Sequence, residues 1–532
     1  MTVATFGSNA PDGDLERHPE LGHKNNTTPT TAPAVQRHED DRASSVYKAS
    51  VSSDPILRRL DRLSAKLNRI WVESIGIRPL TVAERTGESW WSVGLLWFSA
   101  NVNVLSFSTG TLASLLELDM RSAMLTIFFV GAFCCLFPAY FSLFGPRLGT
   151  RQMVHCRFSF GYFGASIICL LNGATMLGYC ILNSIVGGQT LAAVSSKSNG
   201  TSTLTPDVGI VIAALISLVV SFSGIRVLHY FERFFWLPVL ICFLVLIGEA
   251  GTGPQGLHVA SNQPEPTSRA VLGLAAIVAG FVISWSALVS DVSHYLRPDV
   301  SPHKLFWSVY CGFFFSCVPF IMIGAAFACS SYDNPEWADA LSVSSGQLFQ
   351  LILAGKLGNF GKFLVVLLAL SVSGNISATI YSFGLTFQTM IPRLSMVPRF
   401  VWPLFAIAIV LPLAIVGHEK FYETLTDFTA VLGYWSSLYV GVVFADHVVI
   451  RKRRYESYNT AIWDNWSKLP LGLAAIGASA ISLAVVVPSI DQVWFTGPIA
   501  ARAGDLGFET GLVASFLLYI PLRLLEVHFF SR

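Results

Sequence analysis

Polar side chains occur inside several of the most apolar stretches of this chain, at depths where hydrocarbon would surround them. The clearest case is segment 90–110, WWSVGLLWFSANVNVLSFSTG, which is long and apolar enough to enter a bilayer. The small and polar residues of its middle are Ser99, Asn101, Asn103, Ser106, Ser108, Thr109 and Gly110. Unpaired amides and freed backbone groups are costly in lipid, so such a segment persists where it lines a wet cavity or a site. An interrupted transmembrane helix is typical of the binding centre of a secondary transporter, although small residues also occur where helices pack closely.

Three further apolar segments carry polar groups that packing does not obviously require. In segment 170–191, Tyr179 and Asn183 are four residues apart and therefore share one face of a helix. Segment 280–296 is broken around a tryptophan and several serines, and segment 370–388 opens with serines, a glycine and an asparagine. Helix packing explains any one of these groups, but four such segments together favour a polar site inside a helix bundle.

The residue types in these segments suit a small, neutral and planar solute. Tyr179 and Trp285 could sandwich a flat ring, and the amide of Asn183 offers a donor beside an acceptor, the pattern that reads a base edge. No arginine lies deep in these segments to bind a carboxylate or a phosphate. The alternative is that the rings are ordinary bundle aromatics and that the amides join neighbouring helices.

Composition limits the class of protein. Of 532 residues 53% are hydrophobic and only 13% are charged, whereas a soluble domain carries roughly 25% charged residues. The net charge of +2 gives no reason to expect nucleic acid as a partner. The nine cysteines form no C-x-x-C pair, and the histidines are spread along the chain, so we expect neither a metal, a cofactor nor an enzyme active site.

The chain divides into four parts. Residues 1–53 are polar, which predicts a disordered cytoplasmic tail. Residues 54–89 form an amphipathic juxtamembrane segment, in which the apolar residues of 54–70 repeat at helical spacing between basic ones; a short solvated helix explains this almost equally well. Residues 90–445 hold a transport core of ten helices, and residues 446–532 hold a basic loop, two further helices and a short cytoplasmic C-terminus.

Apolar runs of spanning length, at about 20 residues per span, predict twelve transmembrane helices. Their approximate ranges are 90–115, 122–144, 160–193, 208–223, 231–248, 271–288, 305–329, 363–388, 400–416, 421–445, 469–488 and 511–528. With the N-terminus inside, the cytoplasmic loops hold about twice as many Lys and Arg residues as the opposite loops. We therefore expect a multi-pass protein with both termini in the cytoplasm.

Four motifs in this order resemble the purine-cytosine permease family of nucleobase–cation symporters, especially its fungal branch. They are GIRPLTVAER at 76–85, WFSANVNVLSFSTG at 97–110, NSIVGGQTL at 183–191 and RVLHYFERFFWLP at 226–238. The similarity covers the chain from about Gly76 to Arg454. The resemblance implies an all-α, LeuT-like fold, with an inverted repeat of five plus five helices and two peripheral helices. It also implies uptake of cytosine and purines across the plasma membrane.

The resemblance places the substrate between an aromatic residue of the third span and a tryptophan of the sixth, with amides from the third and eighth spans. The positions that match in this sequence are Ser99, Tyr179, Asn183, Trp285, Ser286 and either Asn375 or Thr379.

Two departures from the family pattern leave the substrate open. The third-span aromatic is often tryptophan and is Tyr179 here, and the stretch GNISATIYS at 374–382 lacks the proline of the cytosine carriers. A carrier of another small heterocycle, such as vitamin B6 (pyridoxine), is therefore an alternative. A transport-deficient nutrient sensor is a second alternative, although a sensor would be expected to have a long structured extension, and the tail has the composition of disorder.

The coupling ion is expected to be a proton rather than sodium. Sodium carriers of this architecture use two adjacent hydroxyl side chains in the eighth span, because a hard cation needs several oxygen ligands at once. Here Ser371 and Ser373 are separated by one residue, and no adjacent Ser/Thr pair occurs between Leu364 and Thr386. The fungal resemblance implies proton coupling as well.

Overall fold

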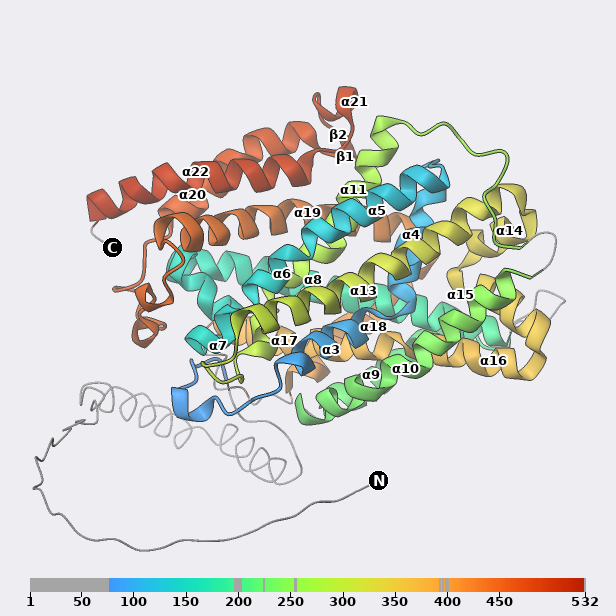
Figure 1. The fold of residues 1–532 in the computed structure, drawn as a ribbon, viewed down its shortest axis with the longest axis horizontal. Helices are drawn as coiled ribbons and strands as arrows, with labels where there is room; N and C mark the ends of the chain where they lie inside the picture. Colours follow the sequence, from blue (N-terminus) through green and yellow to red (C-terminus); the bar gives the residue numbers. More distant parts are fainter. Residues whose placement is uncertain are drawn as a thin grey trace, which may run out of the picture. The chain divides into compact units, whose positions relative to one another are not determined.

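The computed structural model describes residues 76–530 except 196–202, 223–224, 253–255 and, within 392–400, all positions but 394 and 397. The predicted tail 1–53 and the predicted amphipathic helix 54–70 lie outside the described residues. The described part is predominantly helical, with a small antiparallel sheet of β1 (Asp491–Gln492) and β2 (Phe495–Thr496) (Figure 1). The all-α class is therefore confirmed.

The twelve predicted ranges all overlap helices. The first five correspond to α3 (Trp90–Asn101) with α4 (Val104–Leu115), α5 (Met120–Cys134) with α6 (Leu136–Phe141) and α7 (Phe144–Leu148), α8 (Gln152–Val194), α9 (Pro206–Phe222) and α10 (Ile225–Ala250). The next five correspond to α11 (Ser268–Ile283) with η2 (Ser284–Ala287), α13 (Pro302–Ser330), α16 (Gly355–Leu370) with α17 (Val372–Met390), α18 (Val401–Gly417) and α19 (Phe421–Ala445). The last two are α20 (Leu473–Val486) and α22 (Gly507–Phe530), which pack together beside α19 (Figure 1).

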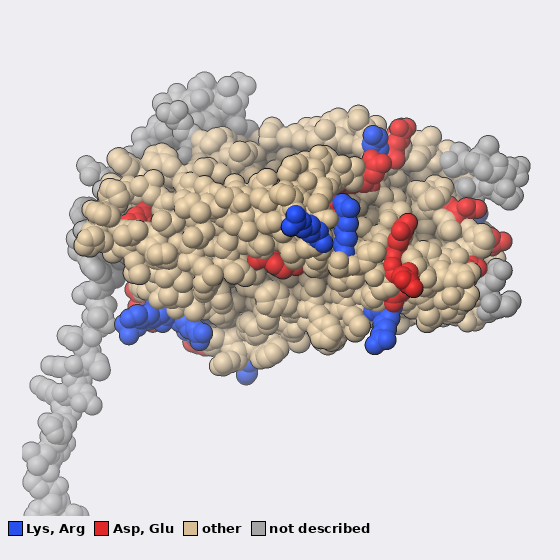
Figure 2. Space-filling view, turned by 90° about the horizontal axis from the view of Figure 1, so that it is seen from above, with Lys and Arg blue, Asp and Glu red and all other residues tan. Residues whose placement is uncertain are grey.

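Length and hydropathy support a membrane protein. Among the described residues eight helical stretches are long and apolar enough to cross a bilayer, and three shorter apolar helices accompany them. Large apolar side chains such as Phe129 and Phe163 are exposed, and Figure 2 shows a face on which charged side chains are few. Such a surface suits contact with lipid. The number of twelve crossings stays a prediction.

The first predicted span is interrupted, as its polar residues predicted. Helix α3 ends at Asn101, the backbone is extended at Asn103, and α4 begins at Val104. The side chain of Asn103 donates to the Ala100 carbonyl at 2.7 Å and accepts from the Ser106 amide at 3.0 Å. These polar side chains satisfy backbone groups that the interruption frees, which an apolar sequence could not do inside a bilayer.

The sixth span is interrupted at the corresponding place. Helix α11 ends at Ile283 and continues as the tighter turn η2, after which Leu288 leaves helical geometry and the short helix α12 (Ser290–Ser293) begins. Matched interruptions in the first and sixth spans are what two structural repeats of five helices require.

The third predicted span lies in a long helix that is kinked close to the predicted start of the span. Helix α8 begins at Gln152, and its axis is kinked at Gly161, which has a φ of +69°. A Cβ atom at this position would clash with the carbonyl oxygen of Pro470, so only glycine allows the chain after α19 to pack there. That contact comes from a segment about 300 residues away, so local sequence could not reveal it.

Motif 76–85 is a structural element outside the spans. Arg78 forms an ion pair with Glu84, whose pKa this hydrogen bond lowers to about 2, and Glu84 also accepts from Thr81. Leu80 donates from its amide to the Gly149 carbonyl at 2.8 Å, and Arg85 donates to the Pro146 carbonyl at 2.6 Å. The motif thus holds the segment before α3 against the turn that precedes α8.

Candidate solute-binding site

An aromatic pair occupies the centre of the bundle, where the two interrupted spans approach α8. The rings of Tyr179 on α8 and Trp285 on η2 stack with centroids 5.4 Å apart and planes inclined by 21°, and both side chains are buried. The Tyr179 hydroxyl lies 3.0 Å from the Phe281 carbonyl oxygen and donates to it, and it lies 3.0 Å from the Ser284 hydroxyl. These contacts fix the tyrosine against the last turn of α11.

The predicted sandwich geometry differs in one respect from the structure. Stacked carbon atoms need about 3.5–4.0 Å between them, so a third ring inserted between two others requires them to be about 7 Å apart. Tyr179 and Trp285 lie directly on each other instead. A planar solute therefore either separates the two rings or stacks on a free face of the cluster that they form.

Trp97 is a third aromatic residue of this cluster, and sequence reasoning missed it. Its ring lies 5.4 Å from Trp285, inclined by 58°, and 5.2 Å from Phe313 of α13. The sequence did contain a signal for Trp97. It lies four residues before Asn101, so the two residues share one face of α3.

A chain of amide hydrogen bonds links α8, α17 and the end of α3. Asn183 donates from Nδ2 to Asn375 Oδ1 at 3.0 Å, and Asn375 donates from Nδ2 to the Ala100 carbonyl at 3.0 Å. Because a carbonyl oxygen can only accept, this contact fixes which atom of Asn375 is nitrogen, and the orientation of Asn183 follows. Asn375, rather than Thr379, is therefore the residue of α17 that contacts the amide of α8.

The hydroxyl residues of the predicted site have different surroundings. Thr379 donates to the carbonyl of Asn375 in its own helix at 2.7 Å. Ser286 is fully buried next to Trp285 and has no hydrogen-bond partner among the described residues. Ser99 is buried one residue before Ala100, whose carbonyl receives the amide chain. The structure thus brings Tyr179 against Trp285 and Asn183 against Asn375, while Ser99, Ser286 and Thr379 are buried within one turn of this cluster along their own helices.

Several buried polar atoms of this cluster have no partner within the described part of the chain. They are Trp97 Nε1, Trp285 Nε1, Asn101 Oδ1, Asn183 Oδ1 and Ser286 Oγ. Leaving a buried polar group unpaired costs about 1–3 kcal/mol, so these groups gain stability from any molecule that enters the cluster and pairs with them. The set combines donors with acceptors and contains no charged side chain, which suits a neutral heterocycle that carries both kinds of group.

Ser371 joins the interruption of the first span to the junction between α16 and α17. Its hydroxyl accepts from the Val104 amide at 3.1 Å and donates to the Leu368 carbonyl at 2.6 Å, at the junction between α16 and α17. Ser373, two residues later, is buried and its hydroxyl has no partner among the described residues. The hydroxyl of Ser371 therefore uses its proton and one of its two lone pairs.

The end of the bundle where α8 begins is closed by Arg151, which is 1% exposed. Its guanidinium donates to the carbonyls of Gly76 and Asp291 and to the hydroxyls of Tyr295 and Tyr381. Arg151 thus connects three parts of the fold on this side of the aromatic pair: the segment before α3, the sixth span and α17.

Comparisons with known proteins agree with this arrangement. A family model described as permease for cytosine/purines, uracil, thiamine, allantoin matches residues 79–511. The purine-cytosine permease fcyB of Emericella nidulans is 31% identical over 98% of this chain and 99% of its own length. The vitamin B6 transporter TPN1 of Saccharomyces cerevisiae is 26% identical over 96% of this chain and 98% of its own.

A solved structure shows the same fold. Mhp1, a nucleobase-cation-symport-1 family transporter in a closed conformation with bromovinylhydantoin bound, superposes with a TM-score of 0.64 at 20% identity. The match covers 86% of this chain and 96% of that one. The expected LeuT-like transporter fold is confirmed.

Proposed function

Because the chain belongs to the permease family for cytosine and purines, uracil, thiamine and allantoin, we propose that it imports a nucleobase such as cytosine or a purine across the plasma membrane. It is a multi-pass membrane transporter and not an enzyme. The observation that carries the choice of solute is the set of unpaired, uncharged donors and acceptors around the Tyr179–Trp285 pair. The 31% identity to a purine-cytosine permease, over 98% of this chain, supports the same choice.

Each predicted residue has a role in this proposal. Trp285 and Tyr179 provide stacking surfaces, and Asn183 reads the edge of the base through Oδ1 while Asn375 holds its amide in place. Ser286 and Ser99 provide further hydroxyls, and Thr379 supports the backbone of α17 beside Asn375.

The mechanism is alternating access around this central site. The interrupted spans supply polar backbone and side-chain groups at mid-depth, while one part of the bundle rocks against the other. In the orientation with both termini in the cytoplasm, Arg151 closes the cytoplasmic side and must release its partners from the sixth span before solute leaves.

Competition for uptake identifies the substrate directly. Uptake of labelled cytosine into cells expressing the chain is challenged with unlabelled cytosine, adenine, hypoxanthine, uracil and pyridoxine. The proposal expects strong competition by cytosine and purines and little by pyridoxine. Failure of every nucleobase to compete would refute it.

A vitamin B6 carrier is the second candidate, favoured by Tyr179 in place of the usual tryptophan and by the yeast relative. Its support is weaker because that relative is 26% identical, against 31% for the purine-cytosine permease. Saturable uptake of labelled pyridoxine that cytosine does not inhibit would establish it. Binding of a nucleobase without any uptake would instead favour a nutrient sensor.

We also propose that a proton is the coupling ion. A sodium ion between the interruption of the first span and α17 would need several oxygen ligands at once, and Ser371 has only one lone pair left after accepting from the Val104 amide and donating to the Leu368 carbonyl. No second hydroxyl adjoins it in the sequence.

Replacing Asn183 with alanine is expected to raise the apparent KM for cytosine roughly 5- to 150-fold, because losing the partner of a buried base edge costs about 1–3 kcal/mol. Thr190→Val, on the same helix, is the control, since the Thr190 hydroxyl donates to the Val186 carbonyl of its own helix and Thr190 is not among the predicted site residues. Concentration-dependent uptake, normalised to surface expression, measures both. An unchanged KM for Asn183→Ala would make Asn183 a purely structural residue.

A further inference from the structure

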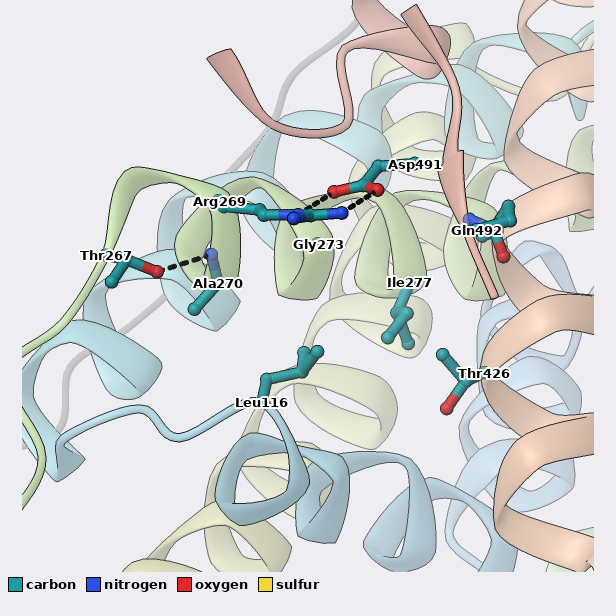
Figure 3. Close-up of a pocket in the computed structure, with 10 residues that line it drawn as sticks. Leu116, Thr267, Arg269, Ala270, Gly273, Ile277, Thr426, Asp491 and Gln492 are labelled. Carbon is teal, nitrogen blue, oxygen red and sulfur yellow. Dashed lines mark hydrogen bonds and ion pairs between the residues drawn. The ribbon is translucent and has the colours of Figure 1, made fainter. Parts of the chain in front are cut away.

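A cavity of about 210 Å³ lies away from the aromatic pair, between the first turns of α11, helix α19 and strand β1. Figure 3 shows Arg269 and Asp491 paired across one side of it, with Leu116 and Ile277 on the opposite side. Ile277 precedes Trp285 by eight residues, about 12 Å along a helix. The cavity is therefore distinct from the central site but is built on the same helix.

The polar side chains that line the cavity are largely paired with protein groups. Gln492 donates from Nε2 to the Tyr434 hydroxyl at 2.8 Å and to Asp505 at 3.1 Å, which fixes the orientation of its amide. Its Oε1 atom is fully buried, so other atoms of Gln492 form the cavity wall. Because Arg269 and Asp491 neutralise each other, the cavity favours an uncharged molecule with an apolar face.

The route from the cavity to the aromatic pair is closed by contact between α11 and α19. A Cβ atom on Gly280 would clash with the carbonyl oxygen of Thr429, so the two backbones touch one turn inward of the cavity. Phe428 of α19 lies edge-on to Tyr179, with ring centroids 5.7 Å apart. Contact between α11 and α19 therefore separates the cavity from the central site on this side.

We propose that this cavity is an outer binding site for the transported nucleobase, occupied before α11 and α19 separate. The proposal rests on the function proposed above, and on the orientation that places the start of α11 outside the cell. The volume is below the roughly 300–1,000 Å³ of sites for drug-sized ligands, which suits a solute of one or two rings. Ile277 and Ala430 contact the faces of its ring, and the paired Arg269 and Asp491 border it without adding a net charge.

Cysteine labelling in whole cells tests the outer site. A Cβ atom on Gly273 would meet only the side chain of Leu116, at 3.7 Å, so Gly273→Cys introduces a thiol on the cavity wall without displacing a neighbour. Val493→Cys on the β1–β2 turn, where the native residue is 84% exposed, is the matched control outside the cavity. Cells expressing the unsubstituted chain give the background, since Cys311 is the one exposed native cysteine and the other eight are buried.

Reaction rates with a membrane-impermeant methanethiosulfonate are measured with and without saturating cytosine, in the otherwise unchanged chain and in a Trp285→Ala background. We expect cytosine to slow the labelling of Gly273→Cys at least about fivefold in both backgrounds, and to leave Val493→Cys unaffected. Protection that disappears with Trp285→Ala would mean that the cavity merely responds to the central site, which overturns the proposal.

A second measurement does not depend on the cysteine variant. Purified full-length protein is expected to bind two cytosine molecules at saturation, and Gly273→Leu, which fills the cavity, is expected to bind one. A stoichiometry of one in the unsubstituted protein would refute the outer site while leaving nucleobase transport intact. Absence of nucleobase uptake by the unsubstituted chain would instead refute the proposed function.

Discussion

Replacing Trp285 with alanine is expected to abolish measurable nucleobase uptake while the protein still reaches the cell surface. Stacking of a base on an aromatic ring contributes about 1–3 kcal/mol, and Trp285 is also the ring that contacts both Tyr179 and Trp97. Removing it therefore removes the stacking surface and lets the other two rings collapse toward the gap. Labelled cytosine uptake over a range of concentrations, together with surface biotinylation, measures the effect.

Two variants separate this role from packing. Trp285→Phe keeps an aromatic face and should retain part of the uptake. Trp337→Ala removes another buried tryptophan, which stacks on Phe327 in a different part of the fold, and should leave the apparent KM unchanged. Transport by Trp285→Ala with unchanged apparent affinity would show that the ring does not bind solute.

Uptake is expected to rise as the external pH falls from about 7 to about 5, to collapse with a protonophore and to persist when choline replaces sodium. The physical reason is that α17 begins without two adjacent hydroxyls for a hard cation: Ser371 and Ser373 are separated by one residue, and the Ser371 hydroxyl keeps only one lone pair free of hydrogen bonds. Initial rates of labelled cytosine uptake in buffers of matched ionic strength provide the measurement.

A strict requirement for sodium would contradict proton coupling. The residues to examine would then be Ser371, Ser373 and the carbonyl of Ala100, which lie at the interruption of the first span and the junction of α16 and α17. Ser373→Ala is the most direct variant, because the Ser373 hydroxyl has no partner among the described residues and its loss should be neutral under proton coupling.

The sequence by itself determined the features that depend on local pattern. Hydropathy predicted the helical segments, and polar residues such as Asn103 predicted the interruption of the first span, because freed backbone groups inside a bilayer need nearby polar partners. The four-residue spacing of Tyr179 and Asn183 predicted that they share a face, because helical periodicity is local. The kink of α8 at Gly161 was not predicted, because it depends on a distant segment.

Only the tertiary structure decided how these residues meet. Asn183 and Asn375 are 192 residues apart, and no local pattern states that their amides bond or that Ala100 completes the chain. The stacking of Tyr179 directly on Trp285, the addition of Trp97 and the cavity beside Gln492 likewise depend on how helices pack. Periodicity determines which face of a helix is polar, but the partner of that face is set by long-range packing, which a single sequence does not encode in any local signal.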